Sequence, residues 1–428
     1  MKTTWILIGL FAASLAARAE SIVLSGATVH TVSGGTIEKG QVLIVDGKIA
    51  AVGEHVVAEN ATVVDLTGRH LYPGLILATS SLGLAEIGAV RATQDTNEVG
   101  AFAPDVQAWV AVNPDSELIP VARANGITHA LTIPLGGTVT GHSGLIRLTG
   151  WTYEEMTVAK PVALHLVWPS MDLNLTPRSE WRSKEEWKSP EEQAEARRAR
   201  VKEIDDFFEE AKAYARARQE DKVVPAWEAL LPLVRNEVPL MIHADDVRQI
   251  KAAVEWAAGK GFRIILAGAR DAHLIAGYLA EKRVPVIYEA TMQQPAFDWE
   301  PYDVHFKAAD VLRRAGVKVA FSNGTGNWAA ADARNLPYHA AMCSAFGMPP
   351  DEAVRAITLN PAEILGVADR LGSIEVGKEA SLIAVDGDLL DIRANVKRMW
   401  IAGKETSLES RHTKLFEKYR NRPKPENR

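Results

Sequence analysis

Histidine and carboxylate side chains gather at two neighbouring places in the second half of the chain. His243 is followed at once by Asp245 and Asp246, and Asp271 and His273 come one strand and one helix later. Imidazole nitrogens and carboxylate oxygens are ligands of zinc-type divalent metals, and three such ligands plus a water form a catalytic zinc site. These residues are candidates for a metal centre or a substrate pocket. Asp245 and Asp246 are equally suited to solvating the loop or capping the next helix.

A further histidine, His142, lies in the glycine-rich segment 136–144. Repeated glycines in a short segment indicate turns with positive φ, in which a histidine can be held simply by hydrogen bonds. No Walker A pattern accompanies these glycines, so the segment does not predict phosphate binding.

Other catalytic classes lack support. Cys343 is the only cysteine, which excludes an intrachain disulfide framework and a cysteine-rich metal cluster. It has no activating cation beside it in sequence, and no Gly-x-Ser-x-Gly motif suggests a serine hydrolase. The formal net charge of −6 over 428 residues argues against a generic nucleic-acid binder.

The elements that must position these residues alternate between strand-like and helix-like segments. Strands are expected at residues 239–243, 262–268, 284–288 and 317–322, separated by amphipathic stretches such as 272–282. This alternation is typical of a parallel sheet wrapped by helices, and no Gly-x-Gly-x-x-Gly fingerprint favours a doubly wound sheet. We therefore predict an α/β fold with a (β/α)8 TIM barrel over residues 74–366. Its functional site is expected at the carboxyl ends of the strands.

Both chain ends are rich in β-strand signals. Residues 42–45 and 49–52 flank Asp46-Gly47-Lys48, which predicts a tight hairpin, and residues 382–385 and 396–404 repeat this arrangement. We expect residues 20–73 and 367–406 to form one small β-sandwich domain. Residues 407–428 are expected to form a charged C-terminal tail.

One segment, residues 176–222, departs from this rhythm because it is dense in Glu, Lys and Arg. Ser189-Pro190-Glu191-Glu192 predicts a capping box with proline in the first helical turn. Apolar residues then recur at helical spacing: Ile204, Phe207, Phe208, Ala211, Tyr214 and Ala215. The segment predicts a long surface helix inserted into the barrel. Trp168, Trp181 and Trp187 either line a substrate entrance or pack this insertion.

The N-terminus carries an export signal. Lys2 precedes an apolar run over residues 5–17, and Ala17-Arg18-Ala19 fits a cleavage site, so residues 1–19 are predicted to be a signal peptide. The mature chain is expected to be secreted, most simply to the periplasm. No later stretch reaches about 18 consecutive apolar residues, so no membrane span is predicted.

Longer motifs make the chain similar to a known family. They are residues 71–76 (LYPGLI), 238–244 (VPLMIHA), 334–338 (RNLPY), 356–366 (AITLNPAEILG) and 372–378 (GSIEVGK). In these motifs the chain resembles the amidohydrolase superfamily, most closely the secreted bacterial members of its imidazolonepropionase-like branch. The resemblance implies a TIM barrel and metal-dependent hydrolysis of a carbon–nitrogen bond in an amide or cyclic amide of small size.

The resemblance also supplies a ligand pattern. Members have a His-x-His pair after the first strand, one histidine after each of the fifth and sixth strands, and a general-base aspartate after the eighth. In this chain His243 matches the fifth-strand histidine. Thr79 and Ser81 stand at the His-x-His positions, Ala267 at the sixth-strand histidine and Asn323 at the aspartate. An asparagine amide cannot act as a carboxylate base. The resemblance therefore implies a degenerate metal site.

Three hypotheses follow. The chain is a pseudo-enzyme that retains the fold, with a homo-oligomer or a paralogous active subunit as its partner. Alternatively, it is an active hydrolase with a site rebuilt around His243, using Asp245, Asp271 or His273. The third hypothesis is a periplasmic small-molecule binding protein, in which His142 contacts a ligand carboxylate or carbonyl at the barrel mouth. A divalent, zinc-type metal is the family's cofactor, and only the rebuilt hydrolase needs one.

Overall fold

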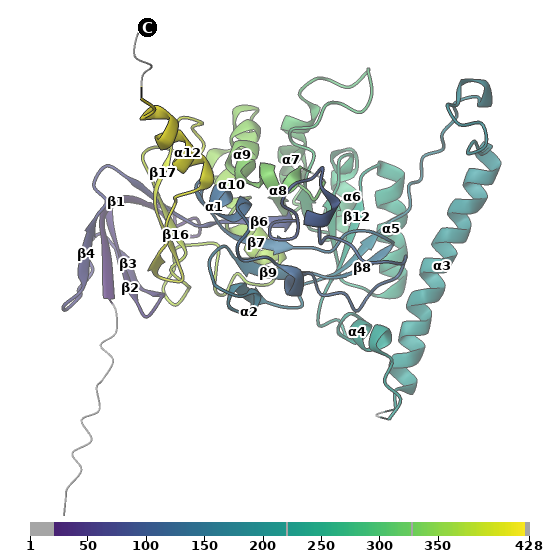
Figure 1. Ribbon diagram of the computed structural model, residues 1–428, viewed down its shortest axis with the longest axis horizontal. Coiled ribbons are helices and arrows are strands. Elements are labelled where there is room, and N and C mark those ends of the chain that lie inside the picture. Colours follow the sequence, from purple (N-terminus) through teal and green to yellow (C-terminus); the bar gives the residue numbers. More distant parts are fainter. Residues whose placement is uncertain (1–20, 220, 327, 424–428) are drawn as a thin grey trace, which may run out of the picture.

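The structure is a computed structural model that describes residues 21–219, 221–326 and 328–423. The expected signal peptide lies outside the described residues. Figure 1 shows three regions side by side: a sheet built from both chain ends, a central layer of strands wrapped by helices, and the long helix α3 (Pro190–Ala217) at the far edge.

The strands from the two chain ends pair in one sheet. Its order is β18-β17-β16-β5-β1-β2-β3, with β4 paired to β1. The bounds are β1 (Ser21–His30), β2 (Thr36–Val45), β3 (Lys48–Gly53), β4 (Thr62–Asp65), β5 (His70–Pro73), β16 (Leu382–Val385), β17 (Val396–Ile401) and β18 (Lys404–Glu405). The prediction that both chain ends contribute to one small β domain agrees with this pairing. The strands form a single sheet, however, so the predicted two-layer sandwich is not confirmed.

Both expected hairpins are present. Val45 pairs with Lys48 across Asp46 and Gly47, which have φ of 48° and 78°. Ala402 and Gly403 repeat this geometry, with φ of 49° and 78°, between β17 and β18. Positive φ at both central residues is the requirement of the type I′ turn, whose twist matches that of the flanking strands. The turn residues therefore fix the register of both hairpins.

The central strands form two further sheets. Their orders are β10-β9-β7-β6 and β15-β14-β13-β12-β11-β8. The bounds are β6 (Leu75–Ser80), β7 (Ile127–Thr132), β8 (Val139–His142), β9 (Gly144–Arg147), β10 (Thr157–Ala159), β11 (Leu164–Val167), β12 (Leu240–Ala244), β13 (Ile264–Gly268), β14 (Val286–Tyr288) and β15 (Val319–Phe321). The four strands predicted from the sequence are confirmed as β12 to β15, each shorter than expected at its amino end.

The arrangement is a mixed α/β fold. Strands β11 to β15 are parallel, as are β6 and β7. The consecutive strands β8 and β9 run antiparallel to β11 and β7 and so join the two sheets. Between β6 and β15 no backbone ladder is formed within the described residues, and Ser322 Oγ instead donates to Thr79 O at 2.8 Å. The closed eight-stranded barrel stays a prediction.

Alternation along the central strands divides their side chains between two cores. Met241, Ile265, Ile287 and Ala320 belong to one buried cluster. Their neighbours, such as Ile242 and Leu266, pack into a second cluster with residues of the surrounding helices. Side chains alternate along a strand, so the residues two positions after Met241, Ile265, Ile287 and Ala320 face the same side as these four. They lie at the carboxyl ends of the strands. We call this end of the strands the mouth.

The helices cover the outside of the central strands. Their bounds are α1 (Leu118–Arg123), α2 (Tyr153–Met156), α4 (Pro225–Val234), α5 (Val247–Lys260), α6 (Ala276–Glu281), α7 (Val304–Arg314), α8 (Ala329–Asp332), α9 (Leu336–Ala345), α10 (Pro350–Arg355), α11 (Leu359–Ile364) and α12 (Arg411–Arg420). Short 3-10 turns are η1 (Arg91–Thr93), η2 (Ala108–Ala111), η3 (Arg178–Glu180), η4 (Ala272–Ile275) and η5 (Ala333–Asn335). The expected C-terminal tail thus contains a helix. In the described part of the chain, no helix combines the length and apolarity needed to cross a membrane.

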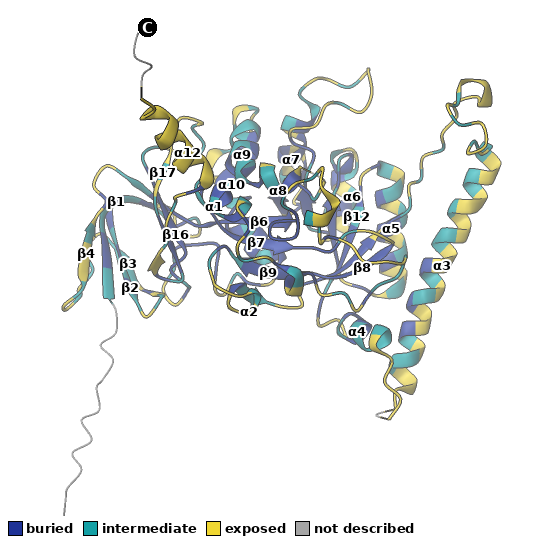
Figure 2. Cartoon of the chain, in the orientation of Figure 1, coloured by how far each residue is buried: buried dark blue, intermediate teal, exposed yellow. Residues whose placement is uncertain are grey.

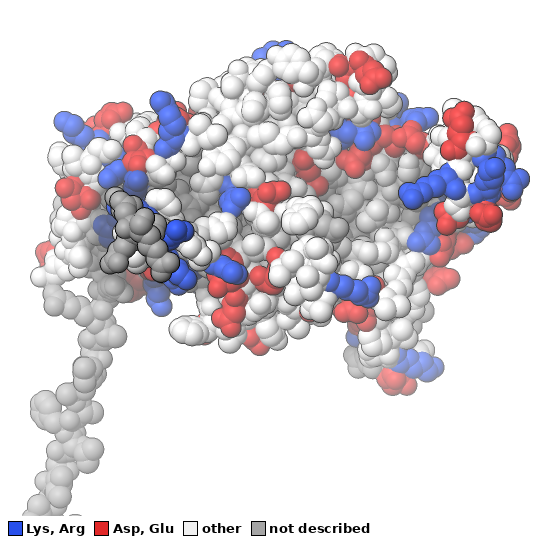
Figure 3. All heavy atoms as spheres, turned by 45° about the horizontal axis from the view of Figure 1, so that its top comes forward, with Lys and Arg blue, Asp and Glu red and all other residues white. Residues whose placement is uncertain are grey.

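The charged insertion folds as predicted around α3. Its Ser189–Glu192 capping box is confirmed, and Ile204, Phe208 and Ala211 are its buried positions. Figure 2 shows most of the helix surface exposed or intermediate, and Figure 3 shows acidic and basic side chains interspersed at this end of the face it displays. Trp168 is buried, and its ring centroid lies 5.2 Å from that of Trp256 on α5. Trp256 in turn packs against Phe208 of α3, with ring centroids 5.2 Å apart.

Candidate functional site

At the mouth, Thr79 of β6 forms hydrogen bonds to two side chains that directly follow strands β14 and β15, Glu289 and Ser322. The hydroxyl of Thr79 donates to Glu289 Oε1 and lies 2.9 Å from Ser322 Oγ. Ser322 Oγ accepts from Thr79 N at 3.1 Å and donates to Thr79 O at 2.8 Å. A register irregularity in β6 between Leu77 and Ser80 accompanies the inward position of Thr79. We call Thr79, Glu289 and Ser322 the mouth network.

Glu289 is the titratable member of this network. Burial raises the pKa of its carboxyl to about 7, while the hydrogen bond from Thr79 opposes the rise and the charge of Asp245 adds to it. A side chain at Gly324 would place its Cβ 2.8 Å from Glu289 Oε2, and Gly324 has φ of +72°, so glycine is required there. A carboxyl with a pKa near neutrality can accept or donate a proton at physiological pH.

Two histidines of the neighbouring strands β11 and β12 form a second pair. His165 Nδ1 lies 2.9 Å from His243 Nε2, and the rings stack with centroids 5.3 Å apart. Burial lowers the pKa of His243 to about 4, and burial together with the nearby His243 holds the pKa of His165 well below its usual range, so both rings are neutral at pH 7. One ring must therefore donate to the other. His165 Nε2 is buried and has no hydrogen-bond partner among the described residues.

The other positions of the family's ligand pattern offer little to a metal. Ala267 is fully buried in the interior cluster and ends in a methyl group. Ser81 is buried, and its hydroxyl has no partner within the described ranges. Asn323 Nδ2 donates to the backbone oxygen of Asp332 at 2.7 Å, and its Oδ1 is without a partner in the described part of the chain.

The nearby carboxylates and histidine predicted as pocket candidates are engaged around Arg270. Asp271 is buried and pairs with Arg270 Nε at 2.8 Å, and His273 Nδ1 lies 3.2 Å from Arg270 O. Asp245 Oδ1 accepts from Arg270 N at 3.4 Å, and burial raises the pKa of Asp245. Asp246 caps α5 through a capping box with Gln249, which confirms the structural alternative given for it.

His142 lies on β8 and faces α4. Its Nε2 is 2.7 Å from Ala229 O, and burial lowers its pKa. This ring nitrogen holds α4 against the strand and is not free to bind a ligand. The geometry matches the structural interpretation of the glycine-rich segment, in which Gly136, Gly137 and Gly141 all have positive φ.

The donor set does not fit the metal that the resemblance implies. Across residues 21–219, 221–326 and 328–423, no group of three or more His, Cys, Asp or Glu side chains is placed to hold a metal ion. His243 is the one imidazole at a family ligand position, and its Nε2 already faces His165. Catalytic zinc generally needs three protein ligands and a water.

Sequence reasoning missed three members of the site: Glu289, Ser322 and His165. Strand alternation could have found them. Each lies two residues beyond an apolar member of the interior cluster, namely Ile287, Ala320 and Ala163. What the sequence could not show is that the mouth network joins strands more than 200 residues apart.

A cavity of about 800 Å³ is lined by the long segment that follows β6 and by Pro134, which lies shortly after β7. Polar residues of that segment, including Asp95, Asn97 and Glu98, line it. Its volume is within the range of small-molecule sites. The cavity offers space for a ligand, although none of Thr79, Glu289 and Ser322 is among its lining residues.

Comparisons with known proteins agree on one family. The family model described as "Amidohydrolase family" matches residues 154–406. The amidohydrolase TasK of Hapsidospora irregularis is 25% identical over 86% of this chain, which spans only 39% of that protein's length. An imidazolonepropionase of Pseudomonas putida (strain GB-1) is 40% identical over 76 residues, which are 18% of this chain and 19% of that protein.

Solved structures support the same assignment. An amidohydrolase from Thermotoga maritima MSB8 superposes with a TM-score of 0.77 at 26% identity, covering 90% of this chain and 99% of that one. An adenosine deaminase from Xanthomonas campestris with bound zinc shares the fold, with a TM-score of 0.53 at 18% identity over 93% of this chain and 97% of that one. Because the family model matches more than half of the sequence, the chain belongs to the amidohydrolase family.

Proposed function

We propose that this chain is a pseudo-enzyme of the amidohydrolase family, which binds a small molecule at the mouth without the family's metal-dependent hydrolysis of carbon–nitrogen bonds. The mouth network carries this proposal. Thr79 stands at the first family ligand position, and its hydroxyl donates a hydrogen bond to Glu289. This position therefore connects β6 to the end of β14 and is not free to bind a metal.

The remaining ligand positions support the same conclusion. Neutral hydroxyl oxygens are poor zinc ligands compared with imidazole and carboxylate. Ala267 has no donor atom, and Asn323 has an amide whose nitrogen is held by Asp332 O. His243 alone falls short of the three ligands of a catalytic zinc site.

A binding role explains the buried polar atoms that lack partners. Ser81 Oγ, His165 Nε2 and Asn323 Oδ1 form no hydrogen bond within the described residues. Unsatisfied buried groups are costly, and in native proteins they commonly await a water or a ligand. Donors and acceptors of this kind suit a small neutral molecule such as an amide or cyclic amide. Secretion to the periplasm and pairing with a second copy or a paralogous active subunit belong to the same proposal.

One observation favours a second candidate, an active hydrolase rebuilt around His243. Glu289 has a pKa of about 7 and lies at the mouth with Asp245 contributing to that value. Such a carboxyl could act as a general base toward water. This candidate predicts turnover of simple amides that is lost in Glu289→Gln.

The two candidates separate in a metal and melting experiment. The chain, its His243→Ala variant and a fourfold variant (Thr79→His, Ser81→His, Ala267→His, Asn323→Asp) are dialysed, counted for metal and melted with and without zinc. Metal bound only by the folded state raises the melting temperature by mass action. We expect zinc to raise the melting temperature of the fourfold variant by several degrees and to leave the unmodified chain unchanged.

Retention of about one metal per unmodified chain, lost on His243→Ala, would overturn the pseudo-enzyme and favour the rebuilt hydrolase. Turnover of amides by the metal-free chain would also overturn the pseudo-enzyme, and its loss in Glu289→Gln would identify Glu289 as the general base. If the fourfold variant fails to fold because the Ala267→His change overpacks the interior, the metal counts of the unmodified chain and of His243→Ala still decide.

A further inference from the structure

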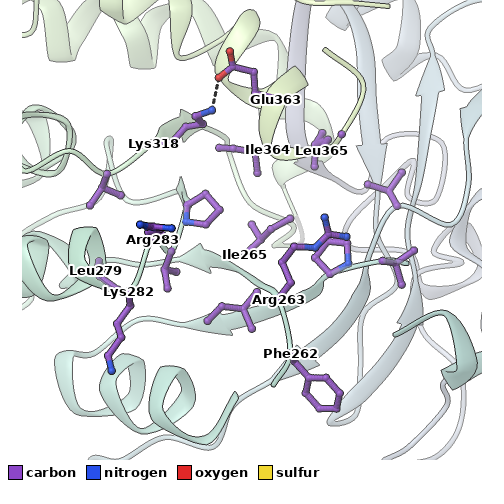
Figure 4. A pocket seen from close by; sticks show the side chains of 18 of the residues that line it. Phe262, Arg263, Ile265, Leu279, Lys282, Arg283, Lys318, Glu363, Ile364 and Leu365 are labelled. Carbon is purple, nitrogen blue, oxygen red and sulfur yellow. Dashed lines mark ion pairs between the residues drawn. The ribbon is translucent and has the colours of Figure 1, made fainter. Parts of the chain in front are cut away.

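The end of the strands opposite the mouth holds a cavity of about 990 Å³. Residues near the amino ends of strands β11 to β15 line it, and the buried apolar part of the lining includes Val162, Val238, Val284 and Val317. Figure 4 shows this cavity with Ile265 and Ile364 in its interior. Barrel enzymes place their chemistry at the other end, so this cavity is a candidate for binding alone.

Basic side chains dominate the charged part of the lining. Five lysines and arginines line the cavity, against the two acids Glu237 and Glu363, although the whole chain has a net charge of −6. Lys318 pairs with Glu363 at 2.5 Å, and Lys282 lies 3.9 Å from Glu255. These two pairs account for only part of the positive charge.

Two arginines keep their charge uncompensated. Arg263 donates only to backbone oxygens, those of Asn236 and Glu237, at 3.5 and 3.3 Å. Arg283 forms no ion pair with any carboxylate in the described part of the chain. Both side chains are exposed, and Figure 4 shows them on either side of Ile265. Guanidinium groups favour carboxylates, so both arginines are candidates to bind an anion in this cavity.

The backbone at Arg283 adds an independent observation. Arg283 has φ of +55° directly after the C-cap of α6, a position at which glycine or asparagine is favoured. Asn236 occupies the equivalent position after α4, with φ of +57°. An arginine is disfavoured in this conformation. No ion pair of the Arg283 side chain within the described residues offsets this cost. Departures of this kind from local preference are expected at functional positions.

We propose that this cavity binds an amphipathic monoanion, a single carboxylate on an apolar chain. The apolar chain packs among the valines and isoleucines of the lining, and the carboxylate lies between Arg263 and Arg283. The proposal concerns the end opposite the mouth and is independent of the function proposed for the mouth.

The test is calorimetric titration of the purified chain with decanoate below its micelle concentration. Decyl maltoside, which shares the apolar chain but is neutral, and acetate, which has only the charged group, are the ligand controls. We expect one decanoate site per chain. Decyl maltoside lacks the charge-assisted hydrogen bonds and acetate lacks the buried apolar chain, so each should bind at least about tenfold more weakly than decanoate.

Arg283→Gly separates ligand binding from folding. Glycine suits a positive φ, so the melting temperature should be unchanged or higher while decanoate affinity falls about tenfold. Lys39→Gly is the matched control, because Lys39 is an exposed cation with φ of +52° outside the cavity. It should keep full affinity. Arg263→Met, which retains the apolar stem, should weaken decanoate as Arg283→Gly does.

Equal decanoate affinity in the unmodified chain and both arginine variants would overturn the proposal, as would tight binding of decyl maltoside. A dimer in light scattering that Arg283→Gly dissociates would identify the cavity as an interface between copies and would also overturn it. If Arg283→Gly lowers the melting temperature, Arg263→Met decides between these outcomes.

Discussion

The two ends of the central strands are built on different principles. At the mouth, polar side chains bond to one another in the mouth network and the His165–His243 pair, while His165 Nε2 keeps no partner within the described residues. At the opposite end, buried valines form an apolar lining and two arginines lack carboxylate partners among the described residues. The interior cluster that includes Met241, Ile265, Ile287 and Ala320 lies along the same strands. The scaffold can therefore persist while the residues at either end change.

This separation explains how a chain can keep a family's fold and change its site. The family's ligand positions are a few side chains at strand ends, and of these five positions in this chain Ala267 belongs to the interior cluster. At this chain's positions, Thr79 and Ser322 use hydroxyls to connect strands β6 and β15. Function depends on such grafted sites more than on the fold.

If apolar packing holds the end opposite the mouth, the largest effect should follow removal of an aromatic ring there. Phe208 of α3 is fully buried and its ring lies 5.5 Å from Phe262, which lines the cavity opposite the mouth. Phe208→Ala should lower the free energy of unfolding by about 3–5 kcal/mol, since it removes a buried aromatic and leaves a cavity. Urea unfolding followed by circular dichroism measures it.

The exposed Phe416 on α12 provides the control for this change. Phe416→Ala should alter the free energy of unfolding by less than about 0.5 kcal/mol. Equal, small effects for both variants would show that α3 is a detachable lid and that the cavity opposite the mouth does not depend on it.

Much of this architecture was predictable because local patterns determine it. Asp46-Gly47 predicted a hairpin through its turn geometry, and Ser189 to Glu192 predicted the start of α3 through capping. The central strands were recognisable from their apolar runs. The two-layer sandwich was not confirmed, since strand signals at both chain ends do not determine how many sheets they form.

The site was less predictable than the fold. The family pattern located Thr79, His243 and Asn323, but Glu289 follows a strand with no motif around it. Its role depends on contact with Thr79, 210 residues earlier, and on burial that raises its pKa. Both are consequences of tertiary packing, which local sequence does not encode. Likewise, the partners taken by Asp271 and His273 around Arg270 became visible only in three dimensions.

A smaller effect should follow loss of a single hydrogen bond at the mouth. Thr79→Val removes the donor to Glu289 and leaves that carboxyl without its partner, so the free energy of unfolding at pH 7 should fall by about 2–3 kcal/mol. Thr28→Val is a matched control, because Thr28 also donates to a glutamate, Glu38, at 3.0 Å on the exposed terminal sheet. A loss as large at Thr28 as at Thr79 would contradict the buried, interdependent network described for the mouth.

The smallest effect is a pH dependence specific to Glu289. Its pKa is raised from 4.5 to about 7, so the folded chain binds this proton more tightly than the unfolded chain does. The resulting stabilisation is present below the unfolded pKa and is lost as pH rises through about 7. The glutamine of the Glu289→Gln variant cannot titrate. The free energy of unfolding of this variant, relative to that of the unmodified chain, should therefore increase by about 1–2 kcal/mol from pH 5 to pH 8. This is less than the full pKa shift would give, because Glu289 is partly exposed and solvent screens its charge. His243, whose lowered pKa acts in the opposite direction, is present in both chains and cancels in the difference. Urea unfolding of both chains at pH 5, 6.5 and 8 measures this difference in the free energy of unfolding. A difference that does not change with pH would show that the Glu289 carboxyl is ionised and solvated. The mouth would then lack the buried polar network that distinguishes it from the opposite end of the strands.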